Sequence, residues 1–257
     1  MIVYKYLHSD RIDVLDKCRV RFTQPSALND PFECFPDLSL YKAKKCQELK
    51  ESPEGKALAQ YGDLDAVVNA SLFDIGEKLI SEISKSFVFL SLSKLRDCLL
   101  MWSHYAQDHK GFVIGFERDC RMFNPNALSD FGLTDIEYSQ ERWVLPEDGL
   151  DSMSEAEINL ANQKWFFLKS RKWEYEAEVR LMTRVDRADE TLPVENDEPI
   201  HLFRFEPAMV REVIFGYRTK LSLRNKIEKI VRSFPAAQLY ESKLDSQFFG
   251  LNIEPIR

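Results

Sequence analysis

The chain has 257 residues, of which 44% are apolar and 30% are charged. These fractions are typical of a globular protein and exclude a disordered, collagen-like or membrane-embedded chain. The 35 Lys and Arg residues against 42 Asp and Glu residues give a net charge of −7. Because an acidic surface repels phosphate backbones, extended nonspecific binding of nucleic acid is disfavoured.

The sequence predicts neither a membrane span nor a secretory signal. Its longest apolar runs, such as 87–90 and 98–102, are far shorter than the roughly 20 residues that cross a bilayer. Residues 1–6 are strand-like and lack the basic, apolar and small-residue regions of a signal peptide. We therefore expect a cytoplasmic protein that binds no membrane.

The common signatures of metal and phosphate sites are absent from the sequence. The five cysteines are scattered and form no Cys-x-x-Cys pair, so we expect no zinc site, no disulfide framework and no metal. The nine glycines form neither a dinucleotide-binding loop nor a P-loop. Function must therefore be inferred from other patterns.

In the first half of the chain, apolar periodicity predicts strands and helices in mixed order. The expected strands are 3–6, 19–23, 87–92 and 112–117, and the expected helices are a polar one within 40–63 that breaks near Pro53, a long amphipathic one at 64–85, and a short one at 98–107. Two prolines and an Asn-Asp pair predict a loop at 24–33.

The second half is predicted to be richer in strands. Ser154 and Glu157 have the spacing of a capping box, which predicts a helix from there to about residue 170. Strands are expected at 134–138, 175–184, 200–205, 210–215, 238–241 and 248–253, with a helix at 222–234. These elements predict an α+β fold with a mixed, mostly antiparallel sheet and peripheral helices, in a single domain (1–257) with a helical insertion at about 40–85.

The segment 173–180 is the most informative part of the sequence. If 175–184 is a strand, its period of two places Glu176, Glu178 and Arg180 on one face. One interpretation is a solvent-facing strand with ion pairs across the sheet. The other is a rigidly held carboxylate at a cleft, able to bind a sugar hydroxyl or stabilise a developing cation.

A second segment, 100–112, combines two histidines, an aromatic pair and a glycine before a strand. On a helix, His104 and Asp108 would be neighbours, so the carboxylate could orient the imidazole. The alternative is an ordinary helix end, with Trp102 and Tyr105 in the core.

Two further sets of polar residues are candidates for a site. Asn29, Asp30 and Glu33 have the composition of a turn. Ser91 and Ser93 emerge from the strand at 87–92 and matter only if that strand borders a cleft.

Four ordered motifs resemble a widespread bacterial family of unknown function. They are Tyr4-Lys5-Tyr6-Leu7, residues 22–33 with Ala27-Leu28-Asn29-Asp30-Pro31-Phe32-Glu33, Met101-Trp102-Ser103-His104-Tyr105-Ala106 with the strand that follows, and Lys172-Trp173-Glu174-Tyr175-Glu176-Ala177-Glu178-Val179-Arg180. The resemblance covers residues 3–216, and the family has no established activity.

The chain also resembles, more distantly, the NAD-dependent ADP-ribosyltransferase superfamily. Those proteins have a first strand bearing His or Arg, a central strand bearing Ser or Tyr, and a later strand with a catalytic Glu, often as Glu-x-Glu. The resemblance implies an ADP-ribosyltransferase-like fold with NAD as substrate. The matching positions here are Lys5, Ser91 or Ser93, and Glu178 with Glu176.

The resemblance also implies roles for these residues. Glu178 would stabilise the oxocarbenium-like transition state, Glu176 would steer the acceptor, and His104 is a further candidate catalytic residue. The expected NAD-binding residues are Lys5, Tyr6, Ser91, Ser93, Trp102, Tyr105, Arg180, Asn29 and Asp30. Such an enzyme would bind a small nucleotide and an unknown macromolecular acceptor, as a toxin or a phage-defence effector.

Two other functions remain open from the sequence. One is a metal-dependent nuclease in which Asp30, Glu33, Glu176 and Glu178 gather around Mg²⁺. The other is a non-enzymatic sensor or partner-binding module of a defence operon, with Trp and Tyr side chains as contact anchors.

Overall fold

The computed structural model describes residues 1–58, 62–124, 132–150, 153–195 and 197–256. The chain divides into two compact units. Unit 1 comprises residues 1–23, 87–136 and 172–257, and unit 2 comprises residues 24–86 and 137–171. The prediction that the chain forms a single domain stays a prediction.

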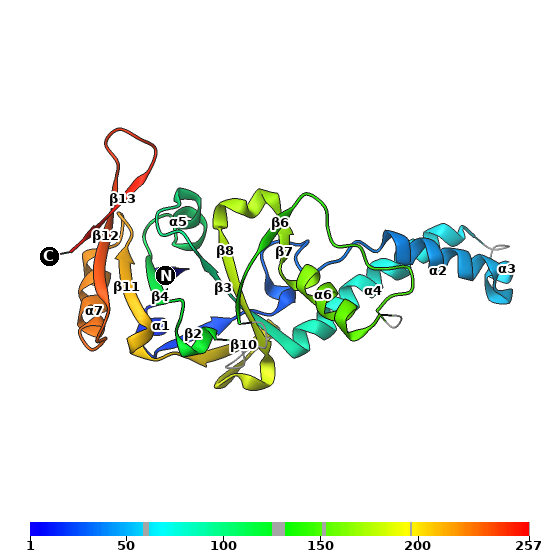
Figure 1. The fold of residues 1–257 in the computed structure, drawn as a ribbon, viewed down its shortest axis with the longest axis horizontal. Coiled ribbons are helices and arrows are strands. Elements are labelled where there is room, and N and C mark those ends of the chain that lie inside the picture. Colours follow the sequence, from blue (N-terminus) through cyan, green and yellow to red (C-terminus); the bar gives the residue numbers. More distant parts are fainter. Residues whose placement is uncertain (59–61, 125–131, 151–152, 196, 257) are drawn as a thin grey trace. The chain divides into compact units, whose positions relative to one another are not determined.

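Among the described residues, unit 1 is built on an eight-stranded sheet in the order β13-β12-β11-β4-β1-β3-β8-β5 (Figure 1). All neighbours pair antiparallel except β11 and β12, which are parallel. The strands are β1 (Ile2–Leu7), β3 (Phe87–Ser93), β4 (Phe112–Glu117), β5 (Leu133–Asp135), β8 (Glu178–Arg184), β11 (Val210–Phe215), β12 (Gln238–Leu244) and β13 (Leu251–Pro255).

The alternation of side chains along β1 separates two apolar clusters of unit 1. Val3 and Leu7 belong to the larger cluster, which also includes Phe112, Val179 and Phe215. Tyr4 and Tyr6 belong to a smaller cluster around Trp102. Because successive side chains of a strand point to opposite faces, a single short strand contributes to both clusters.

Shorter elements complete unit 1. Among the described residues, a second sheet has the order β2-β10-β9, made by β2 (Arg19–Phe22), β10 (Asp197–Arg204) and β9 (Glu190–Val194). The helices are α1 (Asp13–Asp16), α5 (Leu99–Tyr105) and α7 (Leu221–Val231), with short 3₁₀ turns at Arg121–Phe123, Val185–Arg187 and Pro207–Met209. Helix α7 connects the parallel strands β11 and β12 and buries Ile227 and Val231.

Unit 2 is mainly helical. Its elements are the 3₁₀ turn Pro25–Ala27, helices α2 (Ser39–Glu51), α3 (Pro53–Leu58), α4 (Leu64–Ser86) and α6 (Glu155–Phe166), and the parallel strand pair β6 (Glu137–Ser139) and β7 (Leu168–Ser170). The helix break at Pro53 and the long helix from residue 64 are as predicted. The capping box is also confirmed, because Ser154 Oγ accepts a hydrogen bond from the Glu157 amide while the Glu157 carboxylate accepts from the Ser154 amide.

Several predicted elements have different limits in the structure. The helix predicted to end near residue 170 ends at Phe166, and the strand predicted at 134–138 is two strands, β5 and β6, in different sheets. Two further differences concern predicted site residues. Residues Arg171–Glu176 form a 3₁₀ turn, and β8 begins only at Glu178. Between them Ala177 has φ 42°, a left-handed conformation that a strand does not contain. Glu176 therefore does not share a strand face with Glu178, and that prediction was wrong.

Helix α5 is shorter than the predicted helix at 98–107. It ends at Tyr105, and the next residues turn back through left-handed conformations at Gln107, Asp108 and His109. His104 and Asp108 are consequently not helical neighbours, and Asp108 instead lies 3.7 Å from the Lys110 amine. The predicted orientation of His104 by this carboxylate was wrong.

The α+β fold class, with a large and mostly antiparallel sheet, is confirmed. Among the residues that the structure describes, no helix combines the length and the apolarity needed to span a bilayer.

Candidate functional site

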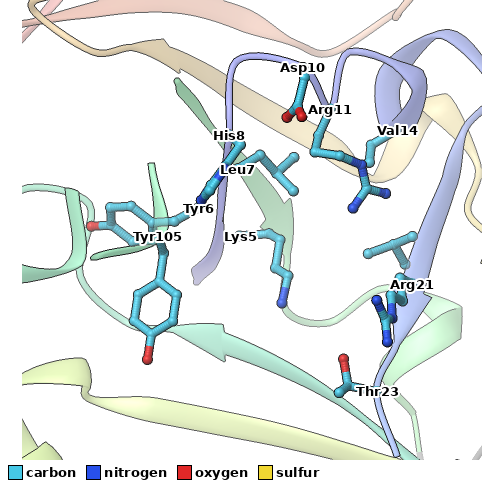
Figure 2. Close-up of a pocket in the computed structure, with 11 residues that line it drawn as sticks. Lys5, Tyr6, Leu7, His8, Asp10, Arg11, Val14, Arg21, Thr23 and Tyr105 are labelled. Carbon is cyan, nitrogen blue, oxygen red and sulfur yellow. The ribbon is translucent and has the colours of Figure 1, made fainter. Parts of the chain in front are cut away.

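A cavity of about 330 Å³ lies in unit 1, on the side of β1 that carries Lys5. Figure 2 shows the Lys5 amine and the Arg11 and Arg21 guanidinium groups directed toward the same space, with the Thr23 hydroxyl beside them. The lining residues are Lys5, Tyr6, Leu7, His8, Asp10, Arg11, Val14, Val20, Arg21, Thr23 and Tyr105. The lining thus has three cationic side chains against the single carboxylate of Asp10.

Lys5 reaches the cavity because β1 and β3 separate next to it. The two strands are in register at Tyr4 and Ser93. One residue further along β1, the Lys5 amine donates a hydrogen bond to the Ser91 carbonyl at 2.9 Å. The Lys5 amine thus donates to a carbonyl of β3 next to the point where the hydrogen-bonded pairing of β1 and β3 ends.

The protein around Lys5 disfavours its charge. Burial lowers the pKa of Lys5 from 10.5 to about 8. The carboxylates of Glu178 and Glu176 oppose this shift, whereas the Arg11 and Arg21 cations add to it. The side chain is nevertheless partly accessible, because its tip faces the cavity.

The two arginines reach the cavity from different elements. Arg21 lies on β2, where Val20 and Phe22 point into the core and Arg21 alternates with them. Its buried Nε has no hydrogen-bond partner among the residues that the structure describes. Arg11 precedes α1, and its Nε donates to the Asp13 carboxylate at 3.1 Å. The Nε of Arg11 is therefore engaged within the protein, whereas the Nε of Arg21 has no acceptor among the described residues.

Tyr105 connects the cavity to one of the predicted catalytic carboxylates. Its hydroxyl donates to Glu176 Oε1 at 2.6 Å, and Glu176 is itself buried. The turn that contains Glu176 is also held by Ser93, whose Oγ donates to the Glu176 carbonyl at 2.6 Å. Tyr6 lines the cavity as well, but its hydroxyl points away and donates to the Leu95 carbonyl.

Glu178 and Arg180 form a buried ion pair at the start of β8. Arg180 Nη2 and Nε lie 2.7 and 2.9 Å from Glu178 Oε1, and both side chains are at most 3% exposed. The Arg180 guanidinium also lies over the Phe89 ring, 5.1 Å from its centre. The strand register places Ser91 opposite Arg180 and Ser93 opposite Glu178. The solvent-facing interpretation of this segment is thus wrong, and among the described residues the cavity lining includes neither member of the pair.

The remaining predicted residues of unit 1 have different environments. Trp102 is fully buried, donates from its indole nitrogen to the Arg96 carbonyl and packs edge-on against Tyr6. No face of its ring is open to a ligand in this structure. His104 is exposed, and its ring contacts those of Tyr105 and Tyr175.

Asn29 and Asp30 belong to unit 2, so their predicted contribution to the site stays a prediction. Asp30 is buried, and its Oδ1 accepts a hydrogen bond from the Phe32 amide at 3.0 Å, as the predicted turn requires. Nearby in unit 2, the buried Glu33 carboxylate lies 3.6 Å from the Lys169 amine.

The described part of the chain contains no group of three or more His, Cys, Asp or Glu side chains placed to hold a metal ion. The four acidic residues of the nuclease alternative are divided between the units, Asp30 and Glu33 in unit 2 and Glu176 and Glu178 in unit 1. The nuclease alternative stays a prediction.

Arg11, Arg21, Thr23, His8 and Asp10 line the cavity but were not predicted as site residues. The alternation of Arg21 with apolar neighbours on β2 was visible in the sequence, yet the same alternation is typical of an ordinary solvent-facing position. Only the packing of β2 beside the separation of β1 and β3 gives it a different role.

Comparison with known protein families gives a match over part of the chain. Residues 101–181 match the family model of DUF2971, a protein of unknown function. The matched region runs from α5 to the middle of β8 and includes Tyr105, Glu176, Glu178 and Arg180. No curated protein and no solved structure matches the chain.

Proposed function

We propose that unit 1 binds the phosphate groups of a small nucleotide, such as NAD, in the cationic cavity. The observation that carries the proposal is the convergence of Lys5, Arg11 and Arg21 on one cavity of a protein whose net charge is −7. Cations that face each other across a protein cavity repel, and a bound anion relieves that repulsion.

The hydrogen-bonding state of the arginines supports the same ligand. A guanidinium presents donors in a planar fork that matches a phosphate. The Nε of Arg21 has no hydrogen-bond partner among the described residues, and leaving a buried charged donor unsatisfied is unfavourable. A phosphate in the cavity would bind the terminal nitrogens of the Arg21 guanidinium, which Figure 2 shows directed into that space, and the Thr23 hydroxyl would be a further donor.

We also propose that the bound nucleotide is processed by ADP-ribosyl transfer to a macromolecular acceptor. Tyr105 would hold the Glu176 carboxylate beside the bound ligand, and Glu178, fixed by Arg180, would contribute its field rather than direct contact. His104, exposed next to Tyr105, would lie on the acceptor side. A cytoplasmic toxin or phage-defence effector is the setting that this activity fits.

The buried state of Glu178 favours a second candidate function. A carboxylate already paired with Arg180 and absent from the described cavity lining cannot touch a ribose without rearrangement. The chain would then be a non-enzymatic nucleotide sensor or partner-binding module of a defence operon. The transferase and the sensor would bind the nucleotide in the same cavity, but only the transferase would convert it to product.

Binding is tested by calorimetric titration of the full chain with NAD, ADP and inorganic phosphate. Arg21→Gln should weaken the binding of all three by about tenfold, since one charge-assisted hydrogen bond is worth roughly 1.5 kcal/mol. Arg11→Gln should weaken it less, because Arg11 is already paired with Asp13. The matched control is Arg184→Gln, which removes an exposed guanidinium of the same unit. Equal affinities for Arg21→Gln and the control would contradict the proposal.

Turnover is tested separately by incubating the protein with NAD and a cell lysate. Release of nicotinamide that is lost in Glu176→Gln and Glu178→Gln variants shown by circular dichroism to be folded, but kept in the exposed control Glu254→Gln, would favour the transferase. Binding of NAD without any nicotinamide release would favour the sensor.

A further inference from the structure

Lys5 is the only lysine among the described residues that line the cavity, and its position is unusual for an amine. Protein surrounds the stem of the side chain, while the tip is open to a space of about 330 Å³. The amine is held in place by a hydrogen bond to the Ser91 carbonyl. Figure 2 shows the amine lying between the Arg11 and Arg21 guanidinium groups on one side and Tyr105 on the other.

These features are the ones that make a lysine amine nucleophilic. Only the neutral amine attacks a carbonyl carbon, and desolvation next to other cations favours that form. With a pKa of about 8, about a quarter of Lys5 would be neutral at pH 7.5, against about one part in a thousand for a lysine with its ordinary pKa.

The charged groups around Lys5 act on its pKa in opposite directions and keep the neutral amine populated near neutral pH. Arg11, which precedes α1, and Arg21 on β2 favour the neutral amine. Glu178 on β8 and Glu176 in the preceding turn favour the charged form. Asp10, His8 and Tyr105 are the other titratable groups that line the cavity. Because the arginines and the glutamates act on Lys5 in opposite directions, its charged and neutral forms are both populated near neutral pH.

We propose that Lys5 forms an imine with the aldehyde or ketone group of a phosphorylated small molecule whose phosphate is bound by Arg21 and Arg11. The lone pair of the neutral amine attacks the carbonyl carbon, and the electrons of the C=O π bond move to the oxygen. Two protons pass from nitrogen to that oxygen, water leaves, and a C=N bond remains. No oxidant or reductant is needed.

This inference rests on the proposed function for the phosphate contacts but not for the amine. Phosphate binding depends on Arg21, whereas imine formation depends on Lys5. The two parts can therefore fail separately, and the experiment must report on each.

Pyridoxal 5′-phosphate is a suitable probe because it combines an aldehyde with a phosphate. The full-length protein is mixed with a small excess of the probe, the imine is reduced with borohydride, and the modified lysines are identified by mass spectrometry of peptides. Pyridoxal, which lacks the phosphate, is the matched probe. Arg21→Gln and the exposed control Arg184→Gln are the matched variants, with folding checked by circular dichroism.

The expected result has four parts. Lys5 is modified ahead of the exposed lysines, and at least tenfold faster by pyridoxal phosphate than by pyridoxal. Inorganic phosphate protects Lys5, Arg21→Gln removes most of the preference for the phosphorylated probe, and Arg184→Gln does not. Modification rises with pH around a midpoint near 8 rather than near 10.5.

Two results would overturn the proposal, and they differ in what fails. If exposed lysines are modified while Lys5 stays unmodified in a protein that still binds phosphate, the amine is structural and serves only the Ser91 carbonyl. If Lys5 reacts equally with both probes and phosphate gives no protection, the amine is reactive but the phosphate site, and with it the proposed function, is wrong.

Discussion

Two regions of unit 1 handle buried charge in opposite ways. At the start of β8, Glu178 and Arg180 satisfy each other at 2.7 and 2.9 Å and are almost fully removed from solvent. In the cavity beside β1, Lys5, Arg11 and Arg21 have like charge and face a shared space. Strand β3 links the regions, because Ser91 is opposite Arg180 in the register and accepts a hydrogen bond from Lys5.

The comparison separates charges that hold the fold from charges that are available to a ligand. A buried ion pair uses its interaction energy internally, and removing one partner leaves the other uncompensated. Like charges around a cavity gain nothing from each other and gain most from an added anion. The sequence motif with the more conspicuous chemistry, Glu-Ala-Glu, is thus in the internally satisfied region.

The largest expected effect is on the buried pair. Arg180→Met would leave the Glu178 carboxylate buried without its cation, which should lower the free energy of unfolding by about 3–5 kcal/mol. Urea denaturation of the full chain measures this change. In the double variant Arg180→Met with Glu178→Met much of the loss should be recovered, because neither charge then remains. A loss for Arg180→Met as small as that for the exposed Arg184→Gln would mean that the pair does not stabilise the fold.

The second prediction concerns Lys5, which lies among like charges in the cavity instead of in an ion pair. Its pKa in the folded protein is about 8 and in the unfolded chain about 10.5, so the unfolded chain binds more protons between these values. Lys5 therefore destabilises the fold below about pH 8, and this destabilisation is relieved as the pH rises toward 10.5. Relative to wild type, Lys5→Met should be most stable below pH 8 and should lose that advantage, at most about 3 kcal/mol, by pH 10.5.

Urea denaturation of Lys5→Met and wild type at pH 7, 8.5 and 10 tests this, since the titration of all other groups cancels in the difference. A difference in unfolding free energy that does not change with pH would show that Lys5 keeps its ordinary pKa, and the contrast between the two regions would then be lost.

The smallest effect concerns the link between the regions, Tyr105 and Glu176. Tyr105→Phe removes a 2.6 Å donor from a buried carboxylate and should reduce the free energy of unfolding by about 2 kcal/mol. Tyr240→Phe is the control, because its hydroxyl bonds Gln238 in an exposed position. If both variants unfold at the same urea concentration, the Tyr105 hydrogen bond is not formed in solution.

Several elements could be predicted from sequence because local patterns determine them. Strand β11 has the predicted limits Val210–Phe215, and the capping box at Ser154 is formed as expected. Two of the limits that were wrong lie where local backbone geometry interrupts a periodic pattern. Ala177 takes a left-handed conformation inside the predicted strand, and the same occurs at Gln107 after α5. Alternating charges continued through Ala177, so nothing in the periodicity marked the break.

The candidate site was only partly predictable for a related reason. Lys5, Tyr6 and Tyr105 were expected and do line the cavity, whereas Arg11 and Arg21 were not expected. An arginine on an alternating strand is usually exposed, and the sequence contains no signal that β2 lies where two other strands separate.

The sequence by itself determined the α+β composition, most strand and helix positions, and which residues alternate toward the core, because these follow from the spacing of apolar side chains along a few turns or strands. Only the tertiary structure decided which charges meet. Glu176 is 71 residues from Tyr105 and Ser91 is 86 residues from Lys5 along the chain. Contacts at such separations are set by strand register and by the point at which strands separate, and neither property is a function of local sequence.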